Sequence, residues 1–206
     1  SNHRNPDAMY RRLFISSLLA LLAGCATQNT DPQARLGGSL TPRAGKAYVV
    51  VSLTAETFQS NHTYLTARFS QPYGGEGLAL QFGHSISAKL GNDRIGDGAD
   101  SVPGKLQLLE LEPGRYEFSE ATSNWPDPSG REPFSQSNRL PMRHSFELQA
   151  GDAVYLGDIH LQLNDRPQVR IIDAHERDFR HISSQWKISD LCPLQIRLLQ
   201  ADQAQK

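Results

Sequence analysis

Short apolar runs separated by turn-forming residues limit the fold of this chain more than any other feature. The runs are rich in β-branched and aromatic residues, and each has the length of a strand. Long helical segments do not alternate with them, as they would in a parallel sheet flanked by helices. We therefore expect an all-β fold, an antiparallel β-sandwich of about 7–9 strands with one short C-terminal helix. The runs cover residues 48–53, 64–69, 78–82, 106–111, 116–118, 144–148, 153–159 and 169–172.

Two tight turns are predicted from glycines and their neighbours. Pro113 and Gly114 supply the dihedral angles of a turn, and the apolar runs on either side of them predict a hairpin. Gly151 and Asp152 predict a second turn, between the strand that ends before them and the strand that follows.

The predicted helix covers residues 174–182. Asp173 stands where a capping side chain is favoured, and Phe179 and Ile182, three residues apart, are expected to face inward. Apolar residues alternate in the next segment, 191–199, which favours a further strand there.

An apolar run near the N-terminus has the features of an export signal. Two arginines precede it, and it covers residues 13–23 with two serines as its polar members. A membrane-spanning helix needs roughly 20 apolar residues, so this run is too short to remain as an anchor. A basic segment followed by a short apolar segment is typical of a signal peptide. Residues 1–8 precede Met9 and contribute nothing to this signal.

The apolar run closes with Leu22-Ala23-Gly24-Cys25, which resembles the lipobox of bacterial lipoproteins. The resemblance implies that a peptidase cuts before Cys25 and that the thiol of this residue carries a diacylglycerol. Ala26 follows, where inner-membrane lipoproteins of the enterobacterial type carry Asp, so the resemblance implies the outer membrane. The alternative is an ordinary secretory signal in which Cys25 has no role.

The signal divides the chain into three parts. Residues 1–24 are the extraneous start and the signal peptide, residues 25–46 the lipidated cysteine and a flexible tether, and residues 47–206 the sandwich domain. The tether is polar, contains Gly and Pro and lacks periodicity, and about twenty such residues span roughly 25 Å. We expect the remaining cysteine, Cys192, to be a buried small apolar residue, with a reactive thiol as the alternative.

A second resemblance concerns the segment around the first predicted turn. Residues 111–116 (LEPGRY) are similar to the Pro-Gly-x-Tyr hairpin of prealbumin-like and carboxypeptidase-regulatory-type sandwiches. Residues 151–157 follow the same pattern, in which a turn leads into a strand that contains an aromatic residue. The resemblance implies a non-catalytic binding or structural module and names no ligand.

Patterns that would indicate catalysis are few. The net charge of −1 provides no basic field for nucleic acid, so we expect no nucleic-acid partner. The Gly-x-Ser-x-Gly motif of serine hydrolases does not occur, and two cysteines exclude a cysteine-rich zinc site. We expect no enzymatic activity, no cofactor and no bound metal.

Three groups of polar residues are interpreted as solvated surface. Asp158 and His160 alternate along a predicted strand and point to the same face, where we expect a surface pair. The Asp-rich, Gly-rich segment 91–100 lacks the spacing of a calcium loop. The helix carries a cluster without the His-Glu-x-x-His spacing, which we interpret as a charged, solvated face: His175, Glu176, Asp178 and His181.

The candidate binding surface is a proline-stiffened loop over residues 124–134. Trp125 and Phe134 lie at its ends, and together with Arg131 and Tyr73 they could contact a sugar or a protein. The alternative is that Trp125 covers the end of the core.

The sequence as a whole predicts a lipid-anchored envelope protein that faces the periplasm or the cell surface. The sandwich is expected to be a non-catalytic binding or assembly module, whose partners are the membrane and a protein or glycan of the envelope. The alternatives are an accessory lipoprotein of a secretion or pilus machine and an envelope hydrolase with an unusual site of His and Asp residues.

Overall fold

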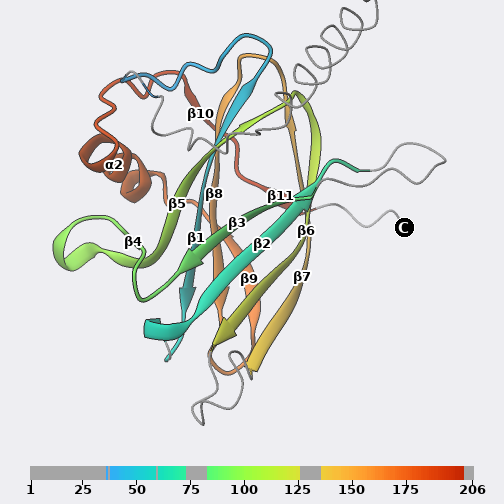
Figure 1. The fold of residues 1–206 in the computed structure, drawn as a ribbon, viewed down its shortest axis with the longest axis vertical. Coiled ribbons are helices and arrows are strands. Elements are labelled where there is room, and N and C mark those ends of the chain that lie inside the picture. Colours follow the sequence, from blue (N-terminus) through green and yellow to red (C-terminus); the bar gives the residue numbers. More distant parts are fainter. Residues whose placement is uncertain (1–35, 37, 59, 73–82, 126–135, 202–206) are drawn as a thin grey trace, which may run out of the picture. The chain divides into compact units, whose positions relative to one another are not determined.

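The computed structural model describes residues 36, 38–58, 60–72, 83–125 and 136–201. The described strands form two sheets that pack face to face, and helix α2 (His175–Gln185) lies near the C-terminus (Figure 1). The predicted β-sandwich with a short C-terminal helix is confirmed. The predicted strand at 78–82 lies outside the described residues.

The first sheet has six strands, in the order β10-β8-β1-β5-β4, with β9 also paired to β8. β8 is parallel to β1 and to β10, and the other pairs in this sheet are antiparallel. The strands are β1 (Ala47–Glu56), β4 (Arg94–Ile95), β5 (Val102–Leu111), β8 (Ala153–Gln162), β9 (Gln168–Ile172) and β10 (Leu194–Ile196).

The second sheet has five strands, all antiparallel, in the order β11-β7-β6-β2-β3. Two short 3₁₀ turns, η2 (Ser60–His62) and η3 (Gly98–Asp100), lie in the connections of the chain. The strands of this sheet are β2 (Tyr64–Ser70), β3 (His84–Lys89), β6 (Gly114–Trp125), β7 (Gln136–Leu148) and β11 (Gln200–Ala201).

Strand β1 is buried on both of its faces. Val49, Val51 and Leu53 point between the two sheets into the main apolar core, whereas Tyr48 and Val50 belong to a second apolar cluster on the opposite face. Because successive side chains of a strand point to opposite faces, a continuous apolar run is the expected pattern for a strand covered on both sides. We call the face of the six-stranded sheet that points away from the five-stranded sheet its outer face.

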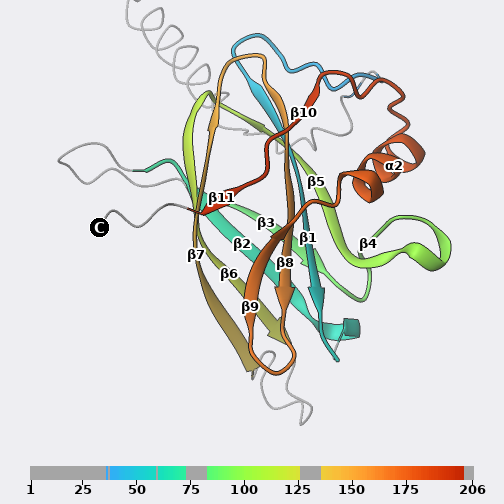
Figure 2. The ribbon, with the colours of Figure 1, turned by 180° about the vertical axis from the view of Figure 1, so that it is seen from behind.

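Helix α2 covers this outer face (Figure 2). Ile182 is fully buried in the second cluster, and Phe179 packs edge-on against Tyr155 of β8. The predicted inward orientation of both helical residues is therefore confirmed. Leu40 is also fully buried in this cluster, so the last residues of the predicted tether segment 25–46 pack against the sandwich.

The predicted hairpin at Pro113-Gly114 is wrong. The chain does turn there, but β5 pairs with β1 and β4, whereas β6 pairs with β2 and β7 of the other sheet. The turn therefore carries the chain from one sheet to the other. The prediction failed because an apolar strand on each side of a turn indicates that both are buried, but not that they are neighbours.

The turn at Gly151-Asp152 is present and likewise connects the two sheets. The amide of Asp152 donates to the carbonyl of Gln149 at 3.1 Å, and the Asp152 carboxylate accepts from the Gln149 amide at 2.8 Å. β7 before it and β8 after it belong to different sheets.

Two predictions about the C-terminal segment are corrected. Cys192 is exposed, and not a buried apolar residue; it lies in the connection between α2 and β10. The helix begins one residue later than predicted, with Ala174 in the capping position. Asp173, just before it, still accepts a hydrogen bond from the His175 amide at 3.2 Å.

Candidate functional site

A glycine bulge in β8 creates the polar site of this protein. Val50 pairs with Tyr155 and Ser52 with Asp158, so β8 has one more residue than β1 between these two pairs. The extra residue reverses the alternation of side chains, and Tyr155 and Asp158 therefore both point to the outer face.

Gly157 is required at this bulge. Its φ is +96°, a conformation that side chains with a Cβ rarely adopt. A Cβ there would also lie 3.1 Å from the carbonyl oxygen of Ile172 in β9 and 3.1 Å from the side chain of Leu198. The bulge therefore depends on glycine for its conformation and for its space.

The carboxylate of Asp178 on α2 is completely buried on the outer face and accepts three hydrogen bonds. The hydroxyl of Ser52 in β1 donates to it at 2.7 Å, and the hydroxyl of Tyr155 in β8 donates at 2.6 Å. The Nε of Arg177 donates at 2.7 Å to the other oxygen. These bonds join the helix to two adjacent strands.

Asp158 is the second buried carboxylate and is only 2% exposed. The Nη2 of Arg177 donates to it at 3.1 Å and also donates to the Ser52 hydroxyl at 3.2 Å. The hydroxyl of Thr54 lies 2.8 and 2.9 Å from the two oxygens of Asp158, and 2.9 Å from Nδ1 of His160. One arginine therefore holds two buried carboxylates.

Burial dominates the acid–base properties of this network. It raises the pKa of Asp158, although the charge of Arg177 and the Thr54 hydroxyl oppose the shift. Burial, with the Asp178 carboxylate adding to it, raises the pKa of Tyr155 so far that its hydroxyl remains a donor at physiological pH. For Arg177 burial acts to lower the pKa, but the two carboxylates outweigh it and the pKa is raised.

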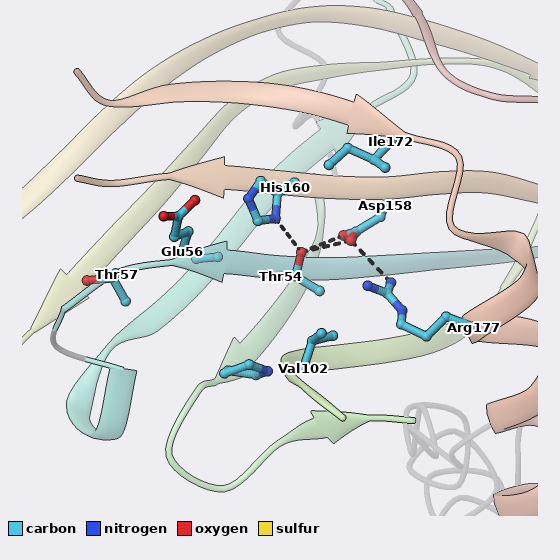
Figure 3. A pocket seen from close by; sticks show the side chains of 10 residues that line it. Thr54, Glu56, Thr57, Val102, Asp158, His160, Ile172 and Arg177 are labelled. Atoms are coloured by element: carbon cyan, nitrogen blue, oxygen red, sulfur yellow. Dashed lines mark hydrogen bonds and ion pairs between the residues drawn. The ribbon is translucent and has the colours of Figure 1, made fainter. Parts of the chain in front are cut away.

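A pocket of about 500 Å³ lies beside this network at the end of β1 (Figure 3). Thr54 lies between His160 and Asp158, and Arg177 approaches Asp158 from the helix side. Apolar side chains from β5 and β9 complete the lining. The residues that line it are Thr54, Ala55, Glu56, Thr57, Val102, Pro103, Asp158, His160, Ile172 and Arg177.

The arrangement of Thr54, Asp158 and His160 is unsuited to nucleophilic catalysis. An activated hydroxyl donates its single proton to an imidazole that an acid orients from the far side. Here the hydroxyl lies in the middle: it contacts the Asp158 carboxylate on one side and Nδ1 of His160 on the other, and a proton donated to the carboxylate is not available to the imidazole. Thr54 is also only 2% exposed, so a substrate has little access to its oxygen. The geometry suits binding better than covalent catalysis.

The structure changes the interpretation of the predicted polar residues. Asp158 and His160 do share a face, as predicted, but the expectation of a surface pair is wrong because Asp158 is buried and paired with Arg177. The expectation of a solvated helix face is wrong for Asp178, which is fully buried.

The hydroxyls that complete the network were not predicted from the sequence. Ser52 and Thr54 interrupt the apolar run of β1 at alternate positions, so they share a face. This spacing is a signal in the sequence that Ser52 and Thr54 make polar contacts with an element that covers this face of β1. Arg177 and Asp158, by contrast, are brought together by tertiary structure, whereas Asp178 follows Arg177 directly in the sequence.

Most of the candidate binding loop falls outside the described residues. Tyr73, Arg131 and Phe134 lie there, and Trp125, at the end of β6, is half-buried. Cys25 also lies outside the described residues.

Across the described parts of the chain, no three His, Cys, Asp or Glu side chains come together in a way that would hold a metal ion. Among the same residues, no helix is both long and apolar enough to cross a membrane. The fold and the site together define a two-sheet sandwich with a helix held on its outer face by buried ion pairs. Comparison with models of protein families, with curated proteins and with solved structures finds no match.

Proposed function

We propose that this chain is a lipid-anchored protein of the bacterial outer membrane whose sandwich domain is a non-catalytic binding module. The observation that carries the proposal is the sequence Leu22-Ala23-Gly24-Cys25 directly after a basic and a short apolar segment. A diacylglycerol on Cys25 would hold the domain at the membrane surface.

The outer face of the six-stranded sheet supports the binding role. The pocket beside Arg177 lies within the size range of small-molecule sites and combines polar groups with an apolar wall. The ion pairs of Arg177 hold the helix and the strands in one arrangement, so the pocket lining is preorganised.

Export and lipidation are tested by expressing the full chain and a Cys25→Ser variant in a Gram-negative host. Growth with an alkyne-bearing palmitate, followed by mass spectrometry of the mature N-terminus, should show a lipid-modified Cys25 in the native chain. The native chain should sediment with outer membranes and the variant should not. A Cys192→Ser variant is the matched control and should behave as the native chain does. A mature N-terminus at any other residue would contradict the proposal.

One observation favours a second candidate, an envelope hydrolase with an unusual site. Asp158, Thr54 and His160 do form a hydrogen-bonded chain beside a pocket. A panel of ester, amide and glycoside substrates tests it, with His160→Ala as the variant. Hydrolysis by the native chain that His160→Ala abolishes would establish the hydrolase and overturn the non-catalytic role.

A further inference from the structure

The pocket beside Arg177 lies at the C-terminal end of β1. This strand begins at Ala47 and ends at Glu56, which is on the pocket lining.

Negative charge predominates in and behind this pocket. Arg177 is already shared by Asp158 and Asp178, so one positive charge faces two buried carboxylates. Glu56 adds a third carboxylate, which is exposed and has no hydrogen-bonding partner among the described residues. Arg170 pairs with His160 across the sheet, but it is exposed and not part of the lining. An anion would be repelled, whereas a cation would meet an unpaired carboxylate.

Apolar side chains lie on two opposite sides of the pocket. Val102 and Pro103 come from β5 and Ile172 from β9, and Ile172 remains partly exposed beside the opening. None of the described lining residues is Phe, Tyr or Trp, so a sugar would lack the large ring against which its apolar face commonly stacks. The shape and charge together suit a short hydrocarbon chain that ends in a positive charge.

We propose that this pocket binds a small organic cation, an alkylammonium ion whose charged nitrogen pairs with Glu56 and whose hydrocarbon part packs against Val102 and Ile172. The inference rests on the proposed binding role of the domain and names the chemical class of its ligand. Arg177 positions Asp158 and closes the inner end of the pocket. Glu56 supplies the charge that a ligand can reach.

Calorimetric titration of the purified full chain with butylammonium at low ionic strength tests this proposal, with butyrate and a neutral hexose as comparison ligands. Butylammonium should bind saturably and more tightly than either, and added salt should weaken the binding because it screens the exposed Glu56. Glu56→Gln should weaken the affinity about tenfold through the loss of a charge-assisted bond. Glu147→Gln, the same change at an exposed position of the five-stranded sheet, should leave it unchanged.

Three outcomes would overturn the proposal: tighter binding of butyrate or hexose, no saturable binding of butylammonium, or equal affinity in native protein and Glu56→Gln. Because Glu56 is exposed, its replacement should leave the fold intact, and an unchanged unfolding transition checks this. None of these outcomes bears on the lipid anchor, which the Cys25→Ser experiment tests separately.

Discussion

The two faces of the six-stranded sheet are buried in different ways. The face toward the five-stranded sheet is mainly apolar, and its side chains come from long strands that cover each other. The outer face is apolar at one end, around Ile182 and Tyr155, and ionic at the other, around Arg177. An apolar face can be covered by any matching apolar surface, whereas the ionic part accepts a helix in one position, because each buried charge needs its partner. The larger apolar cluster lies on the inner face, and the outer face positions the helix and the pocket.

The largest effect is expected at the fully buried carboxylate. Asp178→Ala should reduce the free energy of unfolding by about 3–5 kcal/mol, because it removes one partner of a buried ion pair and leaves Ser52 and Tyr155 without their acceptor. Urea unfolding followed by circular dichroism measures this loss. Glu176→Ala, an exposed change in the same helical turn, should cost less than about 1 kcal/mol. Equal losses in the two variants would mean that the ion pairs do not hold the helix.

The next effect concerns the bulge that turns Asp158 outward. Gly157→Ala should reduce stability by about 2–3 kcal/mol, because the strained φ is combined with contacts to Ile172 and Leu198. Gly151→Ala is the matched control: its φ of +88° is strained as well, but a Cβ there has open space. Its loss should be about 1 kcal/mol. Thermal unfolding of both variants measures the difference, and a smaller loss at Gly157 would contradict the close-packed bulge.

A smaller effect tests whether the apolar parts of the two faces are equivalent. Ile159 lies in the core between the sheets and Ile182 lies under the helix, and both are fully buried. Ile159→Val and Ile182→Val should each cost about 1 kcal/mol, since each removes one buried methylene. Urea unfolding gives both values. A negligible loss at Ile182 alone would show that the helix packs loosely and that the ion pairs carry the contact.

The smallest effect is a difference in pH dependence between two aspartates. Burial raises the pKa of Asp158, so between its unfolded and folded pKa values the folded chain binds the extra proton. Its contribution to stability is therefore present at low pH and is lost as the pH rises through the folded pKa. Asp158→Asn should remove that part of the pH dependence.

Asp152 should behave in the opposite way. Burial acts to raise its pKa, but the Gln149 amide and Arg197 outweigh burial and the pKa is lowered. Its contribution is present above the unfolded pKa and is lost as the pH falls through the folded pKa, so Asp152→Asn should remove stability near neutral pH and none in strong acid. Urea unfolding between about pH 3 and 7 compares both variants with the native chain. Parallel pH profiles for the two variants would contradict the opposite directions of the two pKa shifts.

Much of the fold follows from local patterns, but the pairing of the strands does not. Apolar runs predicted most strands and the inward residues of α2, because alternation and helical spacing depend on neighbours in sequence. The turn at Pro113 was predicted and its hairpin was wrong, since the partners of β5 and β6 are chosen by packing of the two sheets. The site shows the same division: the common face of Asp158 and His160 follows from their spacing, whereas their burial depends on a helix that covers them.

The sequence by itself determined the class of fold and the positions of most strands and the helix, and it predicts an export signal with a lipid at Cys25. These properties depend on residues that are close together along the chain. The tertiary structure alone decided which strands are neighbours, that Gly157 turns Asp158 toward the helix, and that Arg177 joins two buried carboxylates. Electrostatic and hydrogen-bonding partners more than a hundred residues apart, such as Thr54 and Asp158, leave no local pattern, because their interaction exists only after the sheet has formed.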